Sequence, residues 1–119
     1  MQITDKFLFP LTRDTGSFNN WLVMKFGGTS VAAAAHWGAI TEQVRRALAA
    51  GRRPLVVVSA LAGVTDRLLA LDQGRIEWAA ARDALERQHQ ALADGLGLED
   101  RSWLQGGLKH LEETLGLAV

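Results

Sequence analysis

Two apolar runs that end at small residues predict a pair of strands in the first half of the chain. Residues 21–26 are strand formers that stop at Gly27 and Gly28. Residues 55–58, Leu-Val-Val-Val, follow Pro54 and contain no polar position. A continuous apolar run of this kind is typical of a strand that is covered on both faces, as in a parallel sheet.

The segment between these runs has the periodicity of one amphipathic helix. Thr29 or Ser30 is expected to cap it, and Gly51 to end it. Its apolar residues recur at intervals of three and four, at Ala33, Trp37, Ile40, Val44 and Leu48. A strand, a helix of about 20 residues and a second strand form a βαβ unit with a right-handed crossover. This order predicts the α/β fold class.

The second half of the chain has a helical pattern. A short helix is expected with Thr65 as its cap, and a longer one after Gly74 with Trp78 on its apolar face. A last helix follows Glu99, and its two adjacent glycines, at 106 and 107, each weaken it by about 1 kcal/mol and can break it there. Opposite charges stand four residues apart on the longer helix, at Arg82/Glu86 and Asp83/Arg87.

The balance of elements favours part of a larger domain. Residues 1–20 are interpreted as a leader, either a loose terminal arm or an edge strand. A two-stranded parallel sheet leaves both of its edges open. We therefore expect residues 21–119 to be the incomplete N-terminal part of an α/β domain. The chain could fold alone only if the leader or a second copy covered these open edges, so formation of a homo-oligomer is a hypothesis.

Composition excludes several function classes. The 119 residues carry 13 Lys and Arg against 13 Asp and Glu, and this neutral balance argues against a basic nucleic-acid-binding surface. Cysteine is absent, which excludes disulfides and thiolate metal sites. No apolar run approaches the ~18 residues of a membrane span, and residues 1–20 show no secretory signal. These features predict a cytoplasmic protein without a membrane or nucleic-acid partner.

Two loops carry the residues that are suited to ligand chemistry, because loops at the carboxyl ends of neighbouring parallel strands line one crevice. In the first loop, Gly27 and Gly28 let a ligand approach backbone N–H groups, and the following helix start favours an anion. Lys25 would neutralise a phosphoryl group beside them. The second loop runs from Ser59 to Thr65, whose hydroxyls could hold a carboxylate or a second phosphate. For both loops a purely structural interpretation stays open, as a tight turn and a helix cap.

The other polar and aromatic residues receive structural interpretations. The three histidines fall on separate predicted helices without ligand spacing, so no metal or catalytic role is expected for them. Trp37 and Trp78 are assigned to apolar helix faces, and Glu112 with Glu113 to a solvated face. The histidines are His36, His89 and His110.

Two motifs coincide with the candidate loops. Residues 23–31, Val-Met-Lys-Phe-Gly-Gly-Thr-Ser-Val, contain K-F-G-G-T-S, and residues 57–66 fit V-V-S-A-x-x-G-x-T-[ND]. The motifs stand in this order about 35 residues apart, each between a strand and a helix. They resemble the signatures of the aspartokinases, tightly over residues 21–71 and loosely beyond. The Trp37/Ile40 pattern and Arg53-Pro54 are similar to the subgroup that is fused to diaminopimelate decarboxylase.

The resemblance implies an amino-acid-kinase fold, a three-layer α/β sandwich around a mostly parallel sheet, of which the βαβ unit and following helices are the N-terminal portion. It also implies Mg²⁺-ATP as phosphoryl donor and L-aspartate as acceptor, giving 4-phospho-L-aspartate for lysine, threonine and methionine biosynthesis. Lys25 would stabilise the transferring phosphoryl group. By the same resemblance, the ATP site contains Lys25, Phe26, Gly27, Gly28 and Ser30, and the substrate site contains Ser59 and Thr65, with Thr65 touching aspartate.

The chain departs from the family in length. Aspartokinases run several times longer, and their remaining aspartate-binding, nucleotide-binding and regulatory segments would follow Val119. We therefore expect an aspartokinase fragment with little or no kinase activity by itself. Two alternatives stay open. One is a kinase of the same fold that acts on glutamate, carbamate or a nucleotide, against which Thr29-Ser30 and Thr65-Asp66 favour aspartate. The other is a small non-catalytic helical interaction module.

Overall fold

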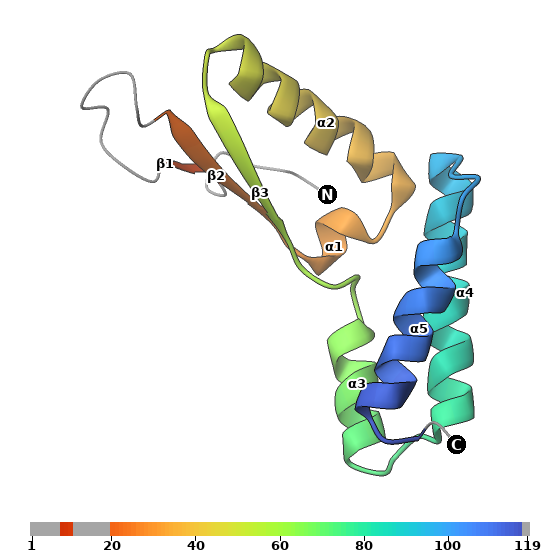
Figure 1. Ribbon diagram of the computed structural model, residues 1–119. Helices are drawn as coiled ribbons and strands as arrows, with labels where there is room; N and C mark the ends of the chain where they lie inside the picture. The colour runs from red at the N-terminus through yellow and green to blue at the C-terminus, as the bar shows by residue number, and fades with distance from the viewer. Residues whose placement is uncertain (1–7, 11–19, 118–119) are drawn as a thin grey trace. The chain divides into compact units, whose positions relative to one another are not determined.

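The chain divides into two compact units, Met1–Gly63 and Val64–Val119. The computed structural model describes residues 8–10 and 20–117 (Figure 1). Apart from Leu8–Pro10 and Asn20, the predicted leader lies outside the described residues.

The first unit contains a three-stranded sheet in the order β1-β2-β3. Strand β2 (Trp21–Phe26) pairs in parallel with β3 (Arg53–Val58), with Met24 opposite Val56. This confirms the predicted parallel pair. Strand β1 (Leu8–Pro10) pairs antiparallel with the other edge of β2, so a segment of the predicted leader supplies an edge strand.

The two parallel strands differ in burial. Met24 and Phe26 of β2 are fully buried. In contrast, residues 55–58 of β3 are 41–49% exposed, so the prediction that this run is covered on both faces is wrong within the described residues. The physical reason is position, because β3 is the last strand of the described sheet and has a neighbour on one side only.

The crossover is formed by two helices instead of the single predicted helix. Helix α1 (Gly28–Val31) has only four residues, and Ala33 is extended before α2 (Ala34–Ala49) begins. The Trp37 indole N–H donates to the carbonyl of Val31 at 3.0 Å, which stabilises this break. Helix α2 packs along β3 (Figure 1). Ile40 of the predicted apolar face is buried, whereas Leu48 is 58% exposed.

The second unit consists of three helices, α3 (Val64–Asp72), α4 (Trp78–Leu96) and α5 (Ser102–Thr114). Helix α5 passes through residues 106 and 107 without interruption, so the expected weak point does not break it. Leu104 and Leu108, on either side of the glycines, are buried. Burial of two leucines offsets the roughly 1 kcal/mol that each helical glycine costs.

Polar side chains connect α4 to α5. The Trp78 indole N–H donates to Glu112 at 3.1 Å, so Glu112 is a half-buried structural partner, whereas Glu113 is exposed as predicted. Arg82 donates to Gln105 at 3.2 Å, and Gln105 donates to Glu86 at 2.6 Å. Both predicted ion pairs within α4 are present, Arg82–Glu86 at 3.1 Å and Arg87–Asp83 at 2.9 Å.

Candidate functional site

The two candidate loops of the first unit meet at the carboxyl ends of β2 and β3, as the topology predicts. Phe26 and Val58 are opposite each other in the parallel register. The Ser59 N–H donates to the carbonyl of Phe26 at 3.2 Å, and the Ala62 N–H donates to the carbonyl of Gly28 at 3.2 Å. These bonds hold the second loop directly against the first.

The adjacent glycines of the first loop have different roles. A Cβ on Gly28 would lie 3.0 Å from the Ala60 carbonyl oxygen and 3.2 Å from the Ala62 nitrogen. Gly28 is therefore required for close packing of the two loops. A Cβ on Gly27 would meet nothing within 4 Å, and its backbone is in an extended conformation that any residue adopts. Gly27 thus leaves accessible space at the end of β2, where a ligand can approach the backbone.

The helix that follows the first loop contributes less to anion binding than the sequence predicts. Gly27 is the N-cap of α1, in place of Thr29 or Ser30, and α1 ends at Val31. Four residues give a much smaller aligned dipole than the expected helix of about 20 residues. Attraction for an anion at this loop therefore depends on individual backbone N–H groups and on Lys25.

Lys25 is the charged side chain nearest to the glycines in the sequence, and it is exposed. Strand alternation places it on the opposite face of β2 from Met24 and Phe26. Phe26 is fully buried and Ser30 is 5% exposed. The exposed lysine and the backbone around Gly27 are consequently the accessible parts of the predicted phosphate site, while the Phe26 side chain packs in the core.

The two predicted hydroxyls of the second loop fall in different units. Ser59 is exposed in the first unit, and its hydroxyl donates to the Ala60 carbonyl at 2.6 Å. Thr65 belongs to the second unit, where it is exposed in the first turn of α3. Because α3 begins at Val64, Thr65 lies inside the helix and does not precede it as the predicted cap.

Sequence reasoning missed the part that Ala60 and Ala62 play in this site. Their backbone atoms are the surface against which Gly28 packs. The small residues of the Ser-Ala-Leu-Ala-Gly segment were the available signal, because only a loop with small side chains can approach a glycine so closely.

Two of the histidines make hydrogen bonds to backbone carbonyls. The His36 ring donates from Nδ1 to the carbonyl of Thr29 at 3.2 Å, since a carbonyl can only accept, and His89 makes the corresponding bond to Leu85 at 2.7 Å. Over residues 8–10 and 20–117, no group of three or more His, Cys, Asp or Glu could hold a metal ion. No helix in the same ranges is long and apolar enough to cross a membrane.

Comparison with known proteins identifies the family. The model of the amino acid kinase family matches residues 20–115, which include both strands of the parallel pair, both loops and the three helices of the second unit. A search of curated proteins and a search of solved structures gave no match. Because the family match spans most of the sequence and contains the whole βαβ unit, the chain belongs to the amino acid kinase family.

Proposed function

We propose that this chain is the N-terminal part of an aspartate kinase and that its first strand-end loop binds the phosphates of ATP. The observation that carries the proposal is the open space beside Gly27, two residues after the exposed Lys25 at the end of β2. The close packing of the second loop at Gly28 supports it, because a ligand at one loop would lie near the other.

The proposed reaction transfers the γ-phosphoryl group of ATP to a side-chain carboxylate oxygen of L-aspartate. The bond between the γ-phosphorus and the ADP oxygen breaks, and a new phosphorus–oxygen bond gives 4-phospho-L-aspartate and ADP. The carboxylate is already ionised at neutral pH, so no general base is needed. Mg²⁺ would arrive bound to the ATP phosphates.

Lys25 has the central role in this proposal. Its ammonium would neutralise the charge of the transferring phosphoryl group, and the backbone N–H groups around Gly27 would orient the phosphates. A hydrogen bond to a charged group contributes about 1.5–3 kcal/mol, which corresponds to roughly 10- to 100-fold in affinity.

The acceptor assignment depends on the second motif. Ser59 and Thr65 would contribute hydroxyls to the L-aspartate site, with Thr65 as the contact to aspartate. Support comes from the sequence Thr65-Asp66 after the loop and from Thr29-Ser30 in the first motif. On this proposal the parent enzyme acts in the cytoplasm, in the biosynthesis of lysine, threonine and methionine.

The test is an amide NMR titration of the 119-residue chain with Mg²⁺-ATP. We expect saturable shifts at residues 25–30, and at least tenfold weaker binding in Lys25→Ala. Lys109→Ala is the matched control, because Lys109 is an equally charged, exposed residue on α5 of the second unit. Equal weakening in both variants would show only nonspecific attraction of the nucleotide to positive charge, and would contradict the proposal.

The same sample distinguishes the acceptors and the competing function. Further shifts with L-aspartate but not with L-glutamate, in the presence of a non-hydrolysable ATP analogue, support the aspartate assignment. L-aspartate-dependent release of ADP that is absent from Lys25→Ala would show that the 119 residues suffice for turnover. A well-dispersed spectrum that ATP leaves unchanged favours the helical interaction module.

A further inference from the structure

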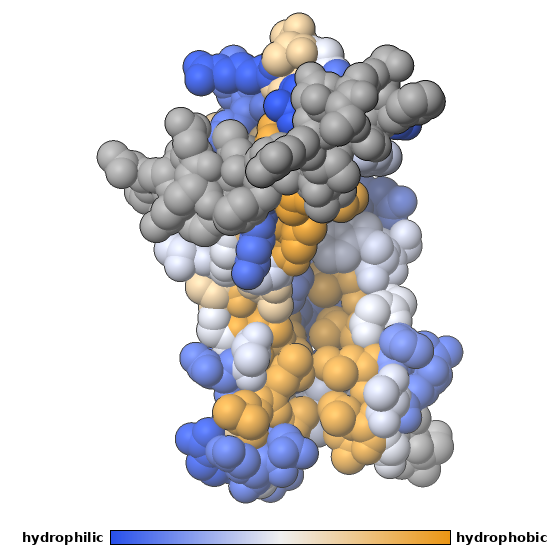
Figure 2. All heavy atoms as spheres, turned by 90° about the vertical axis from the view of Figure 1, so that its left-hand side faces the viewer, coloured by the Kyte–Doolittle hydropathy of each residue, from blue (hydrophilic) through white to orange (hydrophobic). Residues whose placement is uncertain are grey.

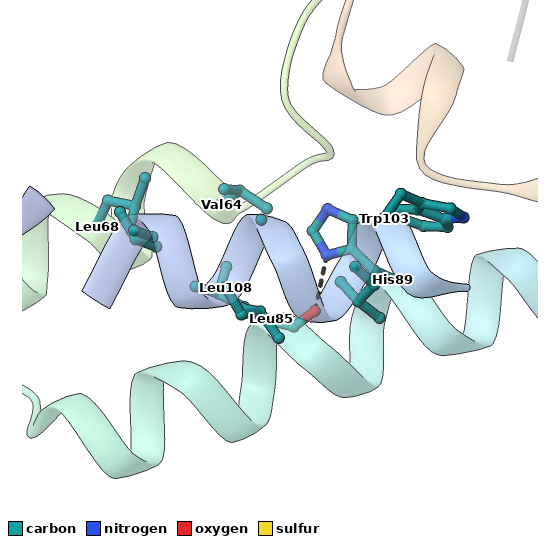
Figure 3. A pocket seen from close by; sticks show the side chains of 9 residues that line it. Val64, Leu68, Leu85, His89, Trp103 and Leu108 are labelled. Carbon is teal, nitrogen blue, oxygen red and sulfur yellow. Dashed lines mark hydrogen bonds between the residues drawn. The ribbon is translucent and has the colours of Figure 1, made fainter. Parts of the chain in front are cut away.

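The second unit contains an apolar cavity that the proposed kinase function does not use. Its volume is about 250 Å³, and residues of all three helices line it. Figure 2 shows the apolar side chains gathered on this unit, and Figure 3 shows the cavity. The labelled lining residues are Val64 and Leu68 of α3, Leu85 and His89 of α4, and Trp103 and Leu108 of α5.

His89 gives this cavity a hydrogen-bonding group with a defined role. Its Nδ1 donates to the Leu85 carbonyl at 2.7 Å, which fixes the proton of the neutral ring on Nδ1 (Figure 3). The other nitrogen, Nε2, then carries a lone pair and lies on the opposite side of the ring from that bond. The Trp103 indole N–H already donates to the Asp100 carbonyl at 2.9 Å. Among the side chains that line the cavity, the His89 ring is therefore the one that carries an acceptor nitrogen.

Gly107 contributes to the size of the cavity. It lines the cavity from α5, and a Cβ at this position would meet nothing within 4 Å. A larger residue would therefore extend into open space on this side of the helix. Gly106 also has no neighbour within 4 Å of its Cβ position, but it does not line the cavity. The two glycines thus form a matched pair for an experiment.

We propose that this cavity binds a small molecule with one aromatic ring and one neutral hydroxyl or N–H donor. An enclosed apolar cavity of about 150 Å³ accepts benzene. The cavity of this unit has about 250 Å³ and is open to solvent beside the half-exposed Trp103, so a substituted ring has room in it. The ring packs against Trp103 and the leucines, where aromatic contacts are favourable. The donor binds Nε2 of His89, and the apolar walls disfavour a charged ligand.

The experiment is an amide NMR titration of the full 119-residue chain with 4-methylphenol, and with toluene as a ring of similar size without a donor. We expect saturable shifts at residues that line the cavity, and about fivefold tighter binding of 4-methylphenol than of toluene, as one hydrogen bond predicts. In His89→Phe this preference disappears while toluene still binds. Equal affinity of the wild-type chain for both ligands, or shifts that do not saturate, would overturn the proposal.

The glycine variants test the location of the site. Gly107→Leu fills the cavity and abolishes binding of both ligands, whereas Gly106→Leu retains it. Equal binding to the two variants overturns the assignment to this cavity. If Gly107→Leu does not fold, the comparison of His89→Phe with the wild-type chain still tests whether the ligand binds in this cavity. If dilution of the free protein shifts the lining resonances as the ligand does, a second copy occupies the cavity and the proposal is wrong.

Discussion

Replacing Gly28 by alanine tests whether the two strand-end loops are held together as the structure shows. The new Cβ would lie 3.0 Å from the Ala60 oxygen, 3.2 Å from the Ala62 nitrogen and 3.3 Å from the Ala62 Cα, where ordinary contacts begin at 3.4 Å. All three neighbours are backbone atoms, so the second loop has to move as a segment. This movement also strains the hydrogen bond of 3.2 Å from the Ala62 N–H to the Gly28 carbonyl.

The expected cost follows from two opposing contributions. Overpacking of a close contact costs about 1–3 kcal/mol. Replacing glycine by alanine restricts the unfolded chain, which stabilises the folded state by about 0.4–1 kcal/mol. We therefore expect Gly28→Ala to lower the free energy of unfolding of the first unit by about 1–2 kcal/mol. Gly27→Ala is the matched control, because it gains the same restriction of the unfolded chain and meets no neighbour within 4 Å.

Amide hydrogen exchange measured by NMR separates the two units. Exchange of the β2 and β3 amides should be about 5- to 30-fold faster in Gly28→Ala than in the wild-type chain, while the amides of α4 are unchanged. In Gly27→Ala, exchange of the strand amides should be equal to the wild-type rate or slower. Equal rates in the two variants would refute the argument that Gly28, and not Gly27, is required by the packing of the loops.

Two further predictions concern the second unit. Gly106→Ala should raise its stability in urea unfolding by up to about 1 kcal/mol, because alanine favours the helix and its Cβ meets no neighbour within 4 Å. No gain in stability would mean that the backbone of α5 is not regular at this position. The pKa of Asp100 is lowered by hydrogen bonds from the Ser102 N–H at 3.0 Å and from the Ser102 hydroxyl at 2.8 Å. The ionised form therefore stabilises the fold above the unfolded-state pKa, and this contribution is lost as pH falls through the lower folded-state pKa. Ser102→Ala removes the hydroxyl bond and should raise the Asp100 pKa in a carbon-13 NMR titration; an unchanged pKa would contradict this cause.

Short-range patterns predicted the two parallel strands and the meeting of the loops that follow them. The strand formers at 21–26 stop at two glycines, and β2 has these bounds in the structure. The continuous apolar run before Ser59 predicted a parallel neighbour, and β3 pairs with β2 in that sense. Because the carboxyl ends of parallel strands lie together, the sequence also predicted that the loops at Gly28 and Ser59 meet. These features depend on neighbours in the sequence and on one pairing rule.

The features that the sequence did not predict depend on contacts between distant residues. Alanines at 32–35 favour a continuous helix, and the break between α1 and α2 is stabilised by an indole bond from Trp37. The glycine pair of α5 favours a break, and burial of Leu104 and Leu108 prevents it. In both cases local propensity and tertiary contacts favour different structures, and the tertiary contacts determine where the helix breaks or continues.

Strand β3 shows why burial is harder to predict than the strand itself. The N–H groups of Arg53, the first residue of β3, and of Ser59, which follows β3, donate at 2.6 Å and 3.2 Å to the carbonyls of the residue before β2 and of the last residue of β2. Backbone groups alternate in direction along a strand, so the N–H groups of Val56 and Val58 point away from β2. Pro54 shares that outward position and has no N–H to leave unpaired. Within the described residues, the outer edge of β3 is therefore regular, and Arg53 is the charged residue of the strand.

The hypothesis of a homo-oligomer predicts that a second copy pairs with this edge and that the chain associates with itself. In an antiparallel pair centred on Val56, the Val56 N–H and carbonyl groups of the two copies bond reciprocally, and each Val58 N–H reaches a Pro54 carbonyl. Arg53 would lie opposite Ser59 of the other copy, so no like charges meet.

Val58→Lys should weaken the association, because a charge on an edge strand opposes pairing. Leu69→Lys is the control, since Leu69 on α3 has the same 49% exposure as Val58. Sedimentation velocity over a range of concentrations measures the effect. A wild-type chain that is monomeric at the highest concentration, or equal weakening by both substitutions, would show that β3 does not pair with itself.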